Sequence, residues 1–387
     1  MAMVKNKDLY WFIYLCQGYG DLYDKSISGK YSVLLKKLKN TQNTPTVCNG
    51  YTEFCNKPYS QISFVATHNS YAYGGVPAIN QYFDISTQLK DGVRVFLLDG
   101  HNSAKGTSDI ELCHTNCTLL DTGTVANTLK NITSFLQNNP NEVITIFWEN
   151  FDKIDPLRYK AEYDKAGLTQ YCRTQPVGSP WPTMASIIQS GQRVINFIDT
   201  NANINTVPWL MPEYSYVFET PFQNSDANAW QCTVDRPKNP PRPTMYMVNH
   251  FLYTIIQGLS SIEVPQPQTA ASTNSDNLNK HVQNCTNIFD DQIPNFVAVD
   301  FYDQGQNNVN AFSVVAGLNK VSYTPQVYGN GTNPLGGGSN KKNSASDLKV
   351  NGLFSAGIAL AEKTSFIDYY VFRVGCLSMS YKTKTFM

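Results

Sequence analysis

Two histidines lie in short motifs whose composition suits acid–base chemistry. His68 follows an apolar segment within residues 61–71 (QISFVATHNSY), and His114 lies within residues 110–117 (IELCHTNC). An unperturbed imidazole titrates close to neutral pH, so one histidine can take a proton from a nucleophile while the other gives a proton to a leaving group. The sequence therefore predicts His68 and His114 as a base–acid pair.

The chain has five histidines, and two of the others compete for these roles. His101 and His250 also follow apolar segments, so they remain alternatives to the first pair. His281 is expected on the surface. For each of these histidines, the alternative is a hydrogen-bonded residue without a catalytic role.

Oxygen-bearing side chains form a second group of candidates. Asn69 directly follows His68, and Asp99 and Glu149 each follow an apolar segment. One amide oxygen and two carboxylates that converge make a hard-oxygen site suited to Ca²⁺ or Mg²⁺. A hydrogen-bonded polar network without a metal is the open alternative. Asp300 also follows an apolar segment, and its carboxylate can orient an imidazole and stabilise the imidazolium cation.

The same arrangement recurs along the chain, where seven apolar segments each end in an acid, an amide or a histidine. Parallel strands of a barrel present chemical groups at their carboxyl ends, so these ends predict the rim of a TIM (β/α)8-type barrel, an α/β fold. Asp199 and Glu219 also stand at such ends, and an eighth strand is not evident. The seven predicted strands are residues 62–66, 94–98, 143–148, 194–198, 216–218, 245–248 and 296–299.

Helices are predicted between these strands. Residues 124–138 carry apolar side chains at helical spacing before an Asn-Pro stop, and residues 85–89 and 184–189 also precede strands. Alternating helices and strands indicate a parallel sheet with helices outside it. The strand ends from His68 to Asp300 span close to the ~250 residues of one barrel, so we expect a single domain.

We expect the barrel domain over residues 48–322. Residues 1–47 form an N-terminal extension whose apolar run is either a poor signal segment or a packed helix. Residues 323–349 are rich in Gly, Asn and Ser, which is typical of a linker. Residues 350–387 form a tail that only partly resembles a glycolipid-anchor signal. No transmembrane span is predicted, and a monomer is expected.

Charge and cysteine content narrow the functional classes. Lys+Arg and Asp+Glu each number 30, and the absence of a basic excess argues against a nucleic-acid-binding protein. No cysteine spacing is typical of a zinc site. Three disulfides are expected, and the alternative is nine reduced thiols. The expected pairs are Cys48–Cys55, Cys113–Cys117 and Cys232–Cys285, with Cys16, Cys172 and Cys376 unpaired.

Four glycosylation sequons, like the expected disulfides, indicate an extracellular protein. Each has the Asn-X-Ser/Thr pattern that is typical of extracellular proteins, although a disulfide-bonded Cys follows two of the asparagines. We therefore expect a secreted or cell-surface glycoprotein. The four asparagines are Asn116, Asn131, Asn284 and Asn330.

Several ordered motifs resemble the catalytic region of phosphatidylinositol-specific phospholipase C, most closely its fungal-type secreted branch. They are THNSY, GVRVFLLDGH, LCHTNC and ITIFWEN, followed by WPTM, ETP, CTVDRP, VNHF and VDFY. The resemblance covers roughly residues 48–322. It implies a TIM barrel and cleavage of the glycerol–phosphate bond of a phospholipid.

The resemblance also implies roles for single residues. His68 resembles the general base of the family, His114 its general acid, and Asp300 the acid that partners a histidine. Asn69, Asp99 and Glu149 resemble three calcium ligands of the metal-dependent members. The remaining rim residues expected to bind substrate are Asp199, Glu219, His250 and Arg236.

Some positions depart from the family patterns. Leu97 stands where the calcium-dependent pattern has a Glu ligand, while Asp99 and Glu149 stand where metal-free bacterial members have Arg and Lys. An anionic phosphodiester beside two carboxylates needs positive charge, and a divalent cation is the simplest source. In a metal-free enzyme, Arg193 or Arg236 would have to supply it.

Three functions are therefore compatible with the sequence. The first is a phosphoric diester hydrolase that acts on phosphatidylinositol or a related phospholipid at a membrane surface, with Ca²⁺ or Mg²⁺ as an expected cofactor. The second is a catalytically weak barrel that binds lipid head groups or cell-wall glycans, which Leu97 favours. The third is a glycosidase with Asp99 and Glu149 as its paired carboxylates.

Overall fold

The computed structural model describes residues 44–331 except 75–77, 115–116, 118–119, 242–243 and 257–261. The chain divides into two units, Met1–Thr46 and Val47–Met387, and the description below concerns the second unit by itself. The expected signal segment, most of the expected linker and the C-terminal tail lie outside the described residues.

A parallel sheet forms the centre of this unit. Its strands follow the order β6, β7, β5, β2, β1, β13, β10, β9, and all neighbouring pairs are parallel. Helices alternate with the strands along the chain, so the predicted α/β TIM-type fold is confirmed. The strands are β1 (Phe64–Thr67), β2 (Val95–Asn102), β5 (Ile144–Glu149), β6 (Cys172–Arg173), β7 (Val194–Ile198), β9 (Val217–Glu219), β10 (Met245–His250) and β13 (Phe296–Val299).

A further short strand, β8 (Leu210–Pro212), pairs in parallel with β7 and was not evident from the sequence. The 3₁₀ turn Glu213–Ser215 follows it directly and leads into β9. Between the two ends of the sheet, the Tyr216 hydroxyl donates to the carbonyl oxygen of Gln175. This turn and hydrogen bond connect the two ends of the curled sheet, and they bring Glu213 to its carboxyl edge.

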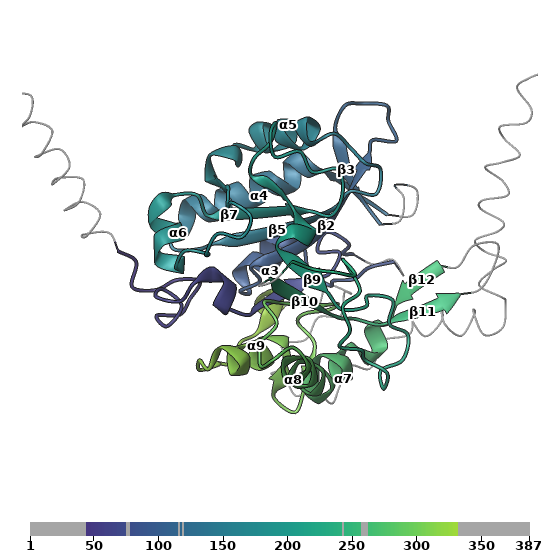
Figure 1. Cartoon of the computed structure of the whole chain (residues 1–387). Helices are drawn as coiled ribbons and strands as arrows, with labels where there is room; N and C mark the ends of the chain where they lie inside the picture. Colours follow the sequence, from purple (N-terminus) through teal and green to yellow (C-terminus); the bar gives the residue numbers. More distant parts are fainter. Residues whose placement is uncertain are drawn as a thin grey trace, which may run out of the picture. The chain divides into compact units, whose positions relative to one another are not determined.

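Helices lie outside the sheet, as Figure 1 shows for α4, α5 and α6 on the side of β5 and β7 and for α8 on the side of β10, while α9 packs against β1 and β13. The three predicted helices are confirmed as α3, α4 and α6. In α4, four fully buried side chains recur on one face, and each contributes about 1.5–3 kcal/mol relative to exposure. The main helices are α3 (Ile85–Lys90), α4 (Val125–Asn138), α5 (Pro156–Ala166), α6 (Met184–Ser190), α8 (Leu278–Ile288) and α9 (Ala311–Asn319).

Two hydrophobic clusters hold these layers together. Strand side chains that point outward pack against the helices, and those that point inward fill the barrel. Phe147, for example, contacts Phe197 and Phe296 inside the barrel, with ring centroids 5.0 and 4.9 Å apart. This packed interior leaves the carboxyl ends of the strands as the place for polar groups.

Antiparallel strands extend this edge. β3 (Ile110–Cys113) pairs with the end of β2 and with β4 (Asp121–Thr124), and β11 (Tyr253–Ile256) forms a hairpin with β12 (Ile262–Pro265) directly after β10. Figure 1 shows this hairpin projecting from the sheet. Within the described ranges, no helix is long and apolar enough to cross a membrane.

All three predicted disulfides are present, and Cys172 is a buried free thiol; Cys16 and Cys376 lie outside the described residues. Among the sequons, Asn131 is exposed on α4, and Asn284 is exposed beside the Cys232–Cys285 bridge.

The barrel domain continues past residue 322, where we expected the linker to begin. Tyr328 is buried and stacks on Phe312, and the backbone N–H of Gly329 donates to Asp91 at 2.9 Å. These contacts place residues 323–331 on the barrel rather than in a linker.

Candidate active site

A cavity opens at the carboxyl ends of the parallel strands. It combines one imidazole and one amide side chain, both from the end of β1, with acids from four other strand ends and with aromatic rings. A short connection between β8 and β9 completes the wall. The lining residues are His68, Asn69, Leu97, Leu98, Asp99, Phe147, Trp148, Glu149, Asp199, Glu213, Tyr214, Glu219, Phe222, Arg236, Met247, Asn249 and Phe251.

His68 is held in one orientation by three side chains. Its Nδ1 lies 2.9 Å from Oδ1 of Asp300, and its ring stacks on Phe251 with centroids 3.8 Å apart and planes 6° apart. Because a carboxylate can only accept, Nδ1 carries the hydrogen and Nε2 keeps a free electron pair. The Tyr253 hydroxyl lies 3.3 Å from Nε2 and can donate to it. His68 is thus arranged as a proton acceptor.

Asp300 does not line the cavity itself but contacts His68, which does. Burial raises the pKa of Asp300, whereas His68 and the hydrogen bonds from His68 and Asn80 lower it. The prediction that Asp300 partners a histidine agrees with this geometry, in which His68 is that histidine.

His114 lies behind Asn69 and is not among the cavity-lining residues. Its Nε2 is 3.2 Å from the amide nitrogen of Asn69, and it is 9% exposed. Burial, followed by the neighbouring His68, lowers the pKa of His114 to about 4. His114 is therefore neutral in the free protein at neutral pH and does not carry the proton that a general acid has to give.

Asn69, Asp99 and Glu149 come together at one side of the cavity. Asp99 and Glu149 are register partners on β2 and β5, and Asn69 adopts a left-handed backbone conformation (φ 42°) that asparagine tolerates. The Tyr71 hydroxyl donates to Oδ2 of Asp99 at 2.8 Å. Burial, followed by Glu149, raises the pKa of Asp99 well above its usual range, and burial also raises the pKa of Glu149.

The contacts of Asn69 test whether these residues suit a divalent cation. Its amide oxygen faces the two Asp99 oxygens at 3.2 and 3.3 Å, which brings three hard oxygen atoms together with no hydrogen to share. A cation would satisfy this contact. A half turn of the amide would also satisfy it, because the amide nitrogen would then donate to Asp99. Asn69 and Asp99 thus offer oxygen atoms of the kind that Ca²⁺ and Mg²⁺ prefer, whereas Leu97 offers none and the half turn pairs the two residues without a cation.

The opposite wall of the cavity contains an arginine between acids. Arg236 donates to Oε2 of Glu219 at 2.9 Å and lies over the Phe222 ring at 4.3 Å. Asn249 also donates to this Glu219 oxygen, at 2.8 Å. Burial, followed by Glu219, raises the pKa of Glu213 well above its usual range. Arg236 is thus already paired with a protein carboxylate.

Asp199 lies between these two groups at the end of β7. Its Oδ1 accepts from the backbone N–H of Asn150 at 2.9 Å, and burial raises the pKa of its carboxyl group. Of the predicted substrate-binding residues, Asp199, Glu219 and Arg236 line the cavity.

His250 does not line this cavity, so the structure does not support it as a substrate ligand. Successive side chains on a strand point to opposite faces, and Asn249 takes the inward position on β10. The His250 ring instead contacts His281 (Nδ1 to Nδ1, 2.9 Å) and the carbonyl oxygen of Thr273. His281, which we expected on the surface, is only 4% exposed because it packs in this cluster.

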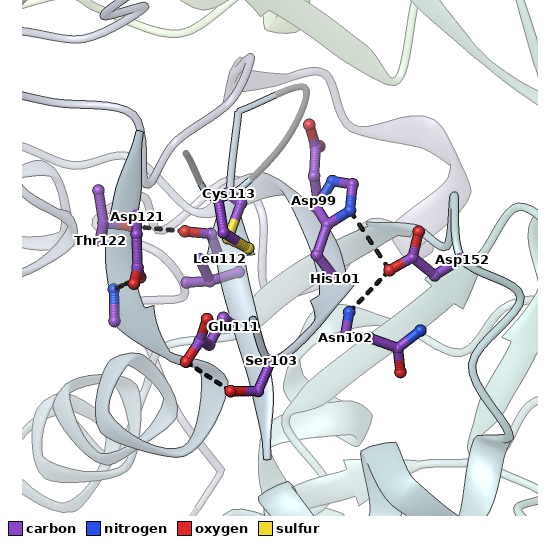
Figure 2. Close-up of a disulfide and its surroundings, with 12 residues drawn as sticks. Asp99, His101, Asn102, Ser103, Glu111, Leu112, Cys113, Asp121, Thr122 and Asp152 are labelled. Atoms are coloured by element: carbon purple, nitrogen blue, oxygen red, sulfur yellow. Dashed lines mark hydrogen bonds and ion pairs between the residues drawn. A yellow bond between two sulfur atoms is a disulfide. The ribbon is translucent and has the colours of Figure 1, made fainter. Parts of the chain in front are cut away.

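Two further candidates lie elsewhere. His101 is not among the residues that line the cavity, and its Nδ1 lies 3.6 Å from Oδ2 of Asp152, as Figure 2 shows. Arg193 is buried before β7, at the opposite end of the strands, where it donates to carbonyl oxygens of Leu136, Asn139 and Glu142. Arg193 therefore cannot supply positive charge to the cavity.

Several cavity residues were missed because their chain positions carry no strong pattern. Glu213 and Tyr214 lie in the turn between two three-residue strands, and Phe251 follows the strand end that we assigned to His250. Asn80 supports Asp300 from a loop between β1 and α3. Only the VNHF motif contained a signal, because its alternation places Asn249 and Phe251 on the same side.

The whole domain is similar to a known family. A family model described as PI-PLC X 1 matches residues 54–316. A secreted protein of Arthroderma benhamiae, itself uncharacterized, is 36% identical over 74% of this chain and 66% of its own length. A PI-PLC X domain-containing protein 1 of the same organism is 34% identical over 67% of this chain and 86% of its own length.

More distant proteins are also similar. A PI-PLC X domain-containing protein of Arabidopsis thaliana is 24% identical over 63% of this chain and 59% of its own length. The solved structure of a mutant phosphatidylinositol-specific phospholipase C from Staphylococcus aureus is 14% identical, with a TM-score of 0.49, over 69% of this chain and 95% of that chain. With the family model spanning residues 54–316, the resemblance seen in the sequence is confirmed, and the chain belongs to the PI-PLC X domain family.

Proposed function

We propose that this protein is a secreted phosphoric diester hydrolase that cleaves the glycerol–phosphate bond of phosphatidylinositol or a related phospholipid. Family membership supports a phospholipase C-like phosphodiesterase. The observation that carries the proposal is the His68–Asp300 pair at the edge of the cavity, with Nδ1 bonded at 2.9 Å and Nε2 left as a proton acceptor. This is the arrangement that a general base requires.

The proposed reaction uses His68 and His114 in sequence. His68 Nε2 takes the proton of a head-group hydroxyl, whose oxygen forms a new bond to phosphorus. The bond from phosphorus to the glycerol oxygen breaks, and His114, which does not line the cavity, gives that oxygen a proton through an intervening water molecule. The products are a diacylglycerol and a cyclic phosphate. Where the head group lacks a neighbouring hydroxyl, water takes its place and the product is an open phosphate ester.

The acid role of His114 depends on the bound substrate. Burial and the neighbouring His68 keep the pKa of His114 near 4 in the free protein. A phosphodiester anion in the cavity favours the protonated imidazole, because an opposite charge nearby raises the pKa of a histidine. We therefore propose that substrate binding brings the proton to His114.

Asn69, Asp99 and Glu149 would hold a divalent cation in this account. Such a cation would compensate negative charge on the phosphoryl oxygens when it is bound. The need for it follows from the cavity, where five acidic side chains face one arginine that is already paired with Glu219. Without added positive charge, an anionic phosphodiester would be repelled.

Exposed apolar side chains support a lipid surface as the place of action. Four of them follow strands whose carboxyl ends form the cavity, so topology places them at the same end of the barrel. Phe151 stands out, because it is 73% exposed directly after β5. The disulfides agree with an extracellular site, as does the secreted relative. The four side chains are Tyr73, Phe151, Ile204 and Ile255.

A catalytically weak barrel that binds head groups or cell-wall glycans is the second candidate. The neutral, buried His114 behind Asn69 favours it, as does Leu97 in the position of a cation ligand. The two candidates differ in one observable, which is the release of a phosphate ester.

The test is to incubate the purified protein with phosphatidylinositol vesicles in Ca²⁺, Mg²⁺ or EDTA. The released phosphate ester is followed by phosphorus NMR, and diacylglycerol is followed by chromatography of the lipids. The proposal expects a cyclic inositol phosphate signal and free diacylglycerol, with more product in Ca²⁺ or Mg²⁺ than in EDTA. Vesicle binding without any released ester would favour the binding barrel instead.

A further inference from the structure

Asn80 is fully buried between the His68–Asp300 pair and Asn69. Its side-chain amide has an NH₂ group on one side and a carbonyl oxygen on the other, and each faces a different part of the site. The NH₂ group donates to both oxygens of Asp300, at 3.1 and 3.1 Å, and lies 3.3 Å from Nδ1 of His68. The carbonyl oxygen accepts from the amide nitrogen of Asn69 at 3.3 Å.

The backbone fixes this amide in place. The N–H of Asn80 donates to the carbonyl oxygen of Ala72 at 2.9 Å, and its own carbonyl oxygen accepts from Phe301 at 2.8 Å. The next residue, Gln81, donates from its side chain to the carbonyl oxygens of His68 (2.8 Å) and Val299 (3.0 Å). Asn80 and Gln81 therefore connect the ends of β1 and β13 beyond the last pair of their ladder.

The orientation of Asn80 determines the orientation of Asn69. Asp300 can accept hydrogen bonds but not donate them, so the NH₂ group of Asn80 must face Asp300. The carbonyl oxygen of Asn80 must then face Asn69, where only an NH₂ group satisfies it. That leaves the amide oxygen of Asn69 facing Asp99 at 3.2 and 3.3 Å, the arrangement that presents three oxygens to a cation. The half turn of Asn69 would place two amide oxygens 3.3 Å apart.

We infer that Asn80 is a positioning residue that orients the Asp300–His68 pair through its NH₂ group and the Asn69 cation ligand through its carbonyl oxygen. The catalytic consequence of this inference rests on the proposed function, whereas both orientations can be measured without turnover. Partners of this kind typically change cation affinity or activity about 10–100-fold when they are removed.

Two substitutions distinguish the contribution of the Asn80 NH₂ group from that of its carbonyl oxygen. Asn80→Asp keeps the shape and the oxygen that faces Asn69, but it replaces the NH₂ group with a carboxylate oxygen that repels Asp300. Asn80→Ala removes both. The first readout is proton NMR of the ring N–H of His68 in protein with ¹⁵N-labelled histidine, where five histidines give a simple spectrum. The His68→Ala spectrum assigns the signal. The second readout is calorimetric titration with Ca²⁺.

We expect the His68 ring N–H signal to be sharp in the wild type and broadened by exchange with water in both variants. Calcium affinity should fall about 10–100-fold in Asn80→Ala and stay at or above the wild-type level in Asn80→Asp. If the wild type is active, kcat should fall about 10–100-fold in both variants while KM changes little for Asn80→Asp. A residue that only fills space would lose stability in both variants but would keep the sharp His68 signal and, in Asn80→Ala, the calcium affinity.

Asn295→Asp is the matched control. Asn295 is equally buried and also connects the two strands, but at their other end, where it donates to the carbonyl oxygens of Ser60 and Ile62. This variant should lower the thermal midpoint while it leaves the His68 signal and calcium affinity unchanged.

Four results would overturn the inference or separate it from the proposed function. A sharp His68 signal in Asn80→Ala would remove the link to the base, and unchanged calcium affinity in Asn80→Ala, or no calcium binding in the wild type, would remove the link to Asn69. The expected NMR and binding pattern in a wild-type protein that releases no ester would contradict the proposed hydrolase and support the positioning role.

Discussion

Asp99 and Glu149 are register partners at the ends of neighbouring parallel strands, so their carboxyl groups share one side of the cavity. Burial, followed by Glu149, raises the pKa of Asp99 well above its usual range. Two acids in this position either hold a proton or hold a cation. The side-chain amide of Asn69 lies 3.2 and 3.3 Å from the two Asp99 oxygens, where its oxygen would share a cation with Asp99 and its nitrogen would donate to Asp99 instead.

Leu97 tests the cation site. It precedes Asp99 by two residues on β2 and lines the same cavity, so a carboxylate at this position points toward the cluster. We expect Leu97→Glu to increase calcium affinity and to shift any metal dependence of turnover to lower concentration. Asp99→Asn should shift both the other way, because it removes charge but keeps one oxygen. Calorimetric titration and turnover over a range of Ca²⁺ concentrations are the measurements.

Leu157→Glu is the control for added charge, since Leu157 is exposed on α5. It should leave calcium affinity unchanged. Full turnover after exhaustive chelation, with no metal found by elemental analysis, would show that the enzyme needs no cation.

Asp300→Asn should disable the base without unfolding the protein. Asparagine can offer its NH₂ group to Nδ1 of His68, which favours the wrong tautomer and leaves Nε2 protonated. We expect kcat to fall by about 10²–10⁴-fold, while vesicle binding is retained. Asp152→Asn is the matched control, because Asp152 partners His101 outside the cavity (Figure 2). Equal losses in the two variants would contradict the special role of the His68–Asp300 pair.

Phe151 should contribute to membrane association. It is 73% exposed at the same end of the barrel as the cavity, and insertion of its ring into a bilayer would remove apolar surface from water. We expect Phe151→Ser to weaken binding to phosphatidylinositol vesicles about fivefold in a sedimentation assay. Ile288→Ser is the control, since Ile288 is 54% exposed at the end of α8, near the opposite end of the barrel. Similar weakening by both would assign lipid binding to general surface apolarity.

His281 should make the protein less stable in acid. Burial lowers the pKa of His281 to about 4, whereas an unfolded histidine titrates near 6.5. The unfolded state then binds more protons, so this residue lowers the free energy of unfolding as the pH falls from about 6.5 to about 4. His281→Asn removes the titration, so the wild-type advantage over the variant should shrink by roughly 2–3 kcal/mol between about pH 7.5 and 4.5. Urea unfolding at both pH values measures this, and a constant difference would contradict it.

The strand ends were predictable because each joins an apolar run to a polar residue. This pattern placed His68, Asp99, Glu149 and Asp300 at one edge before the sheet order was known, because all strands of a parallel barrel end on the same side. The cysteine pairs were predictable for a similar local reason, since two of them close loops of four and seven residues.

The rest depended on contacts that adjacent residues do not reveal. β8 is three residues long, too short for an alternating pattern, so Glu213 and its place in the cavity were missed. His250 and Asn249 differ by one position, and only the direction of β10 decides which of them faces inward. His281 was expected at the surface, but its face of α8 packs against β10.

The turnover of His68→Ala tests the central claim most directly. Among the histidines in the described ranges, His68 alone lines the cavity, and its Nδ1 is held by Asp300, so no other described histidine can replace it as the base. With phosphatidylinositol vesicles, we predict that His68→Ala loses at least about 10²-fold in kcat while its vesicle binding stays within about twofold of the wild type. Near-normal turnover in His68→Ala would contradict the proposed mechanism.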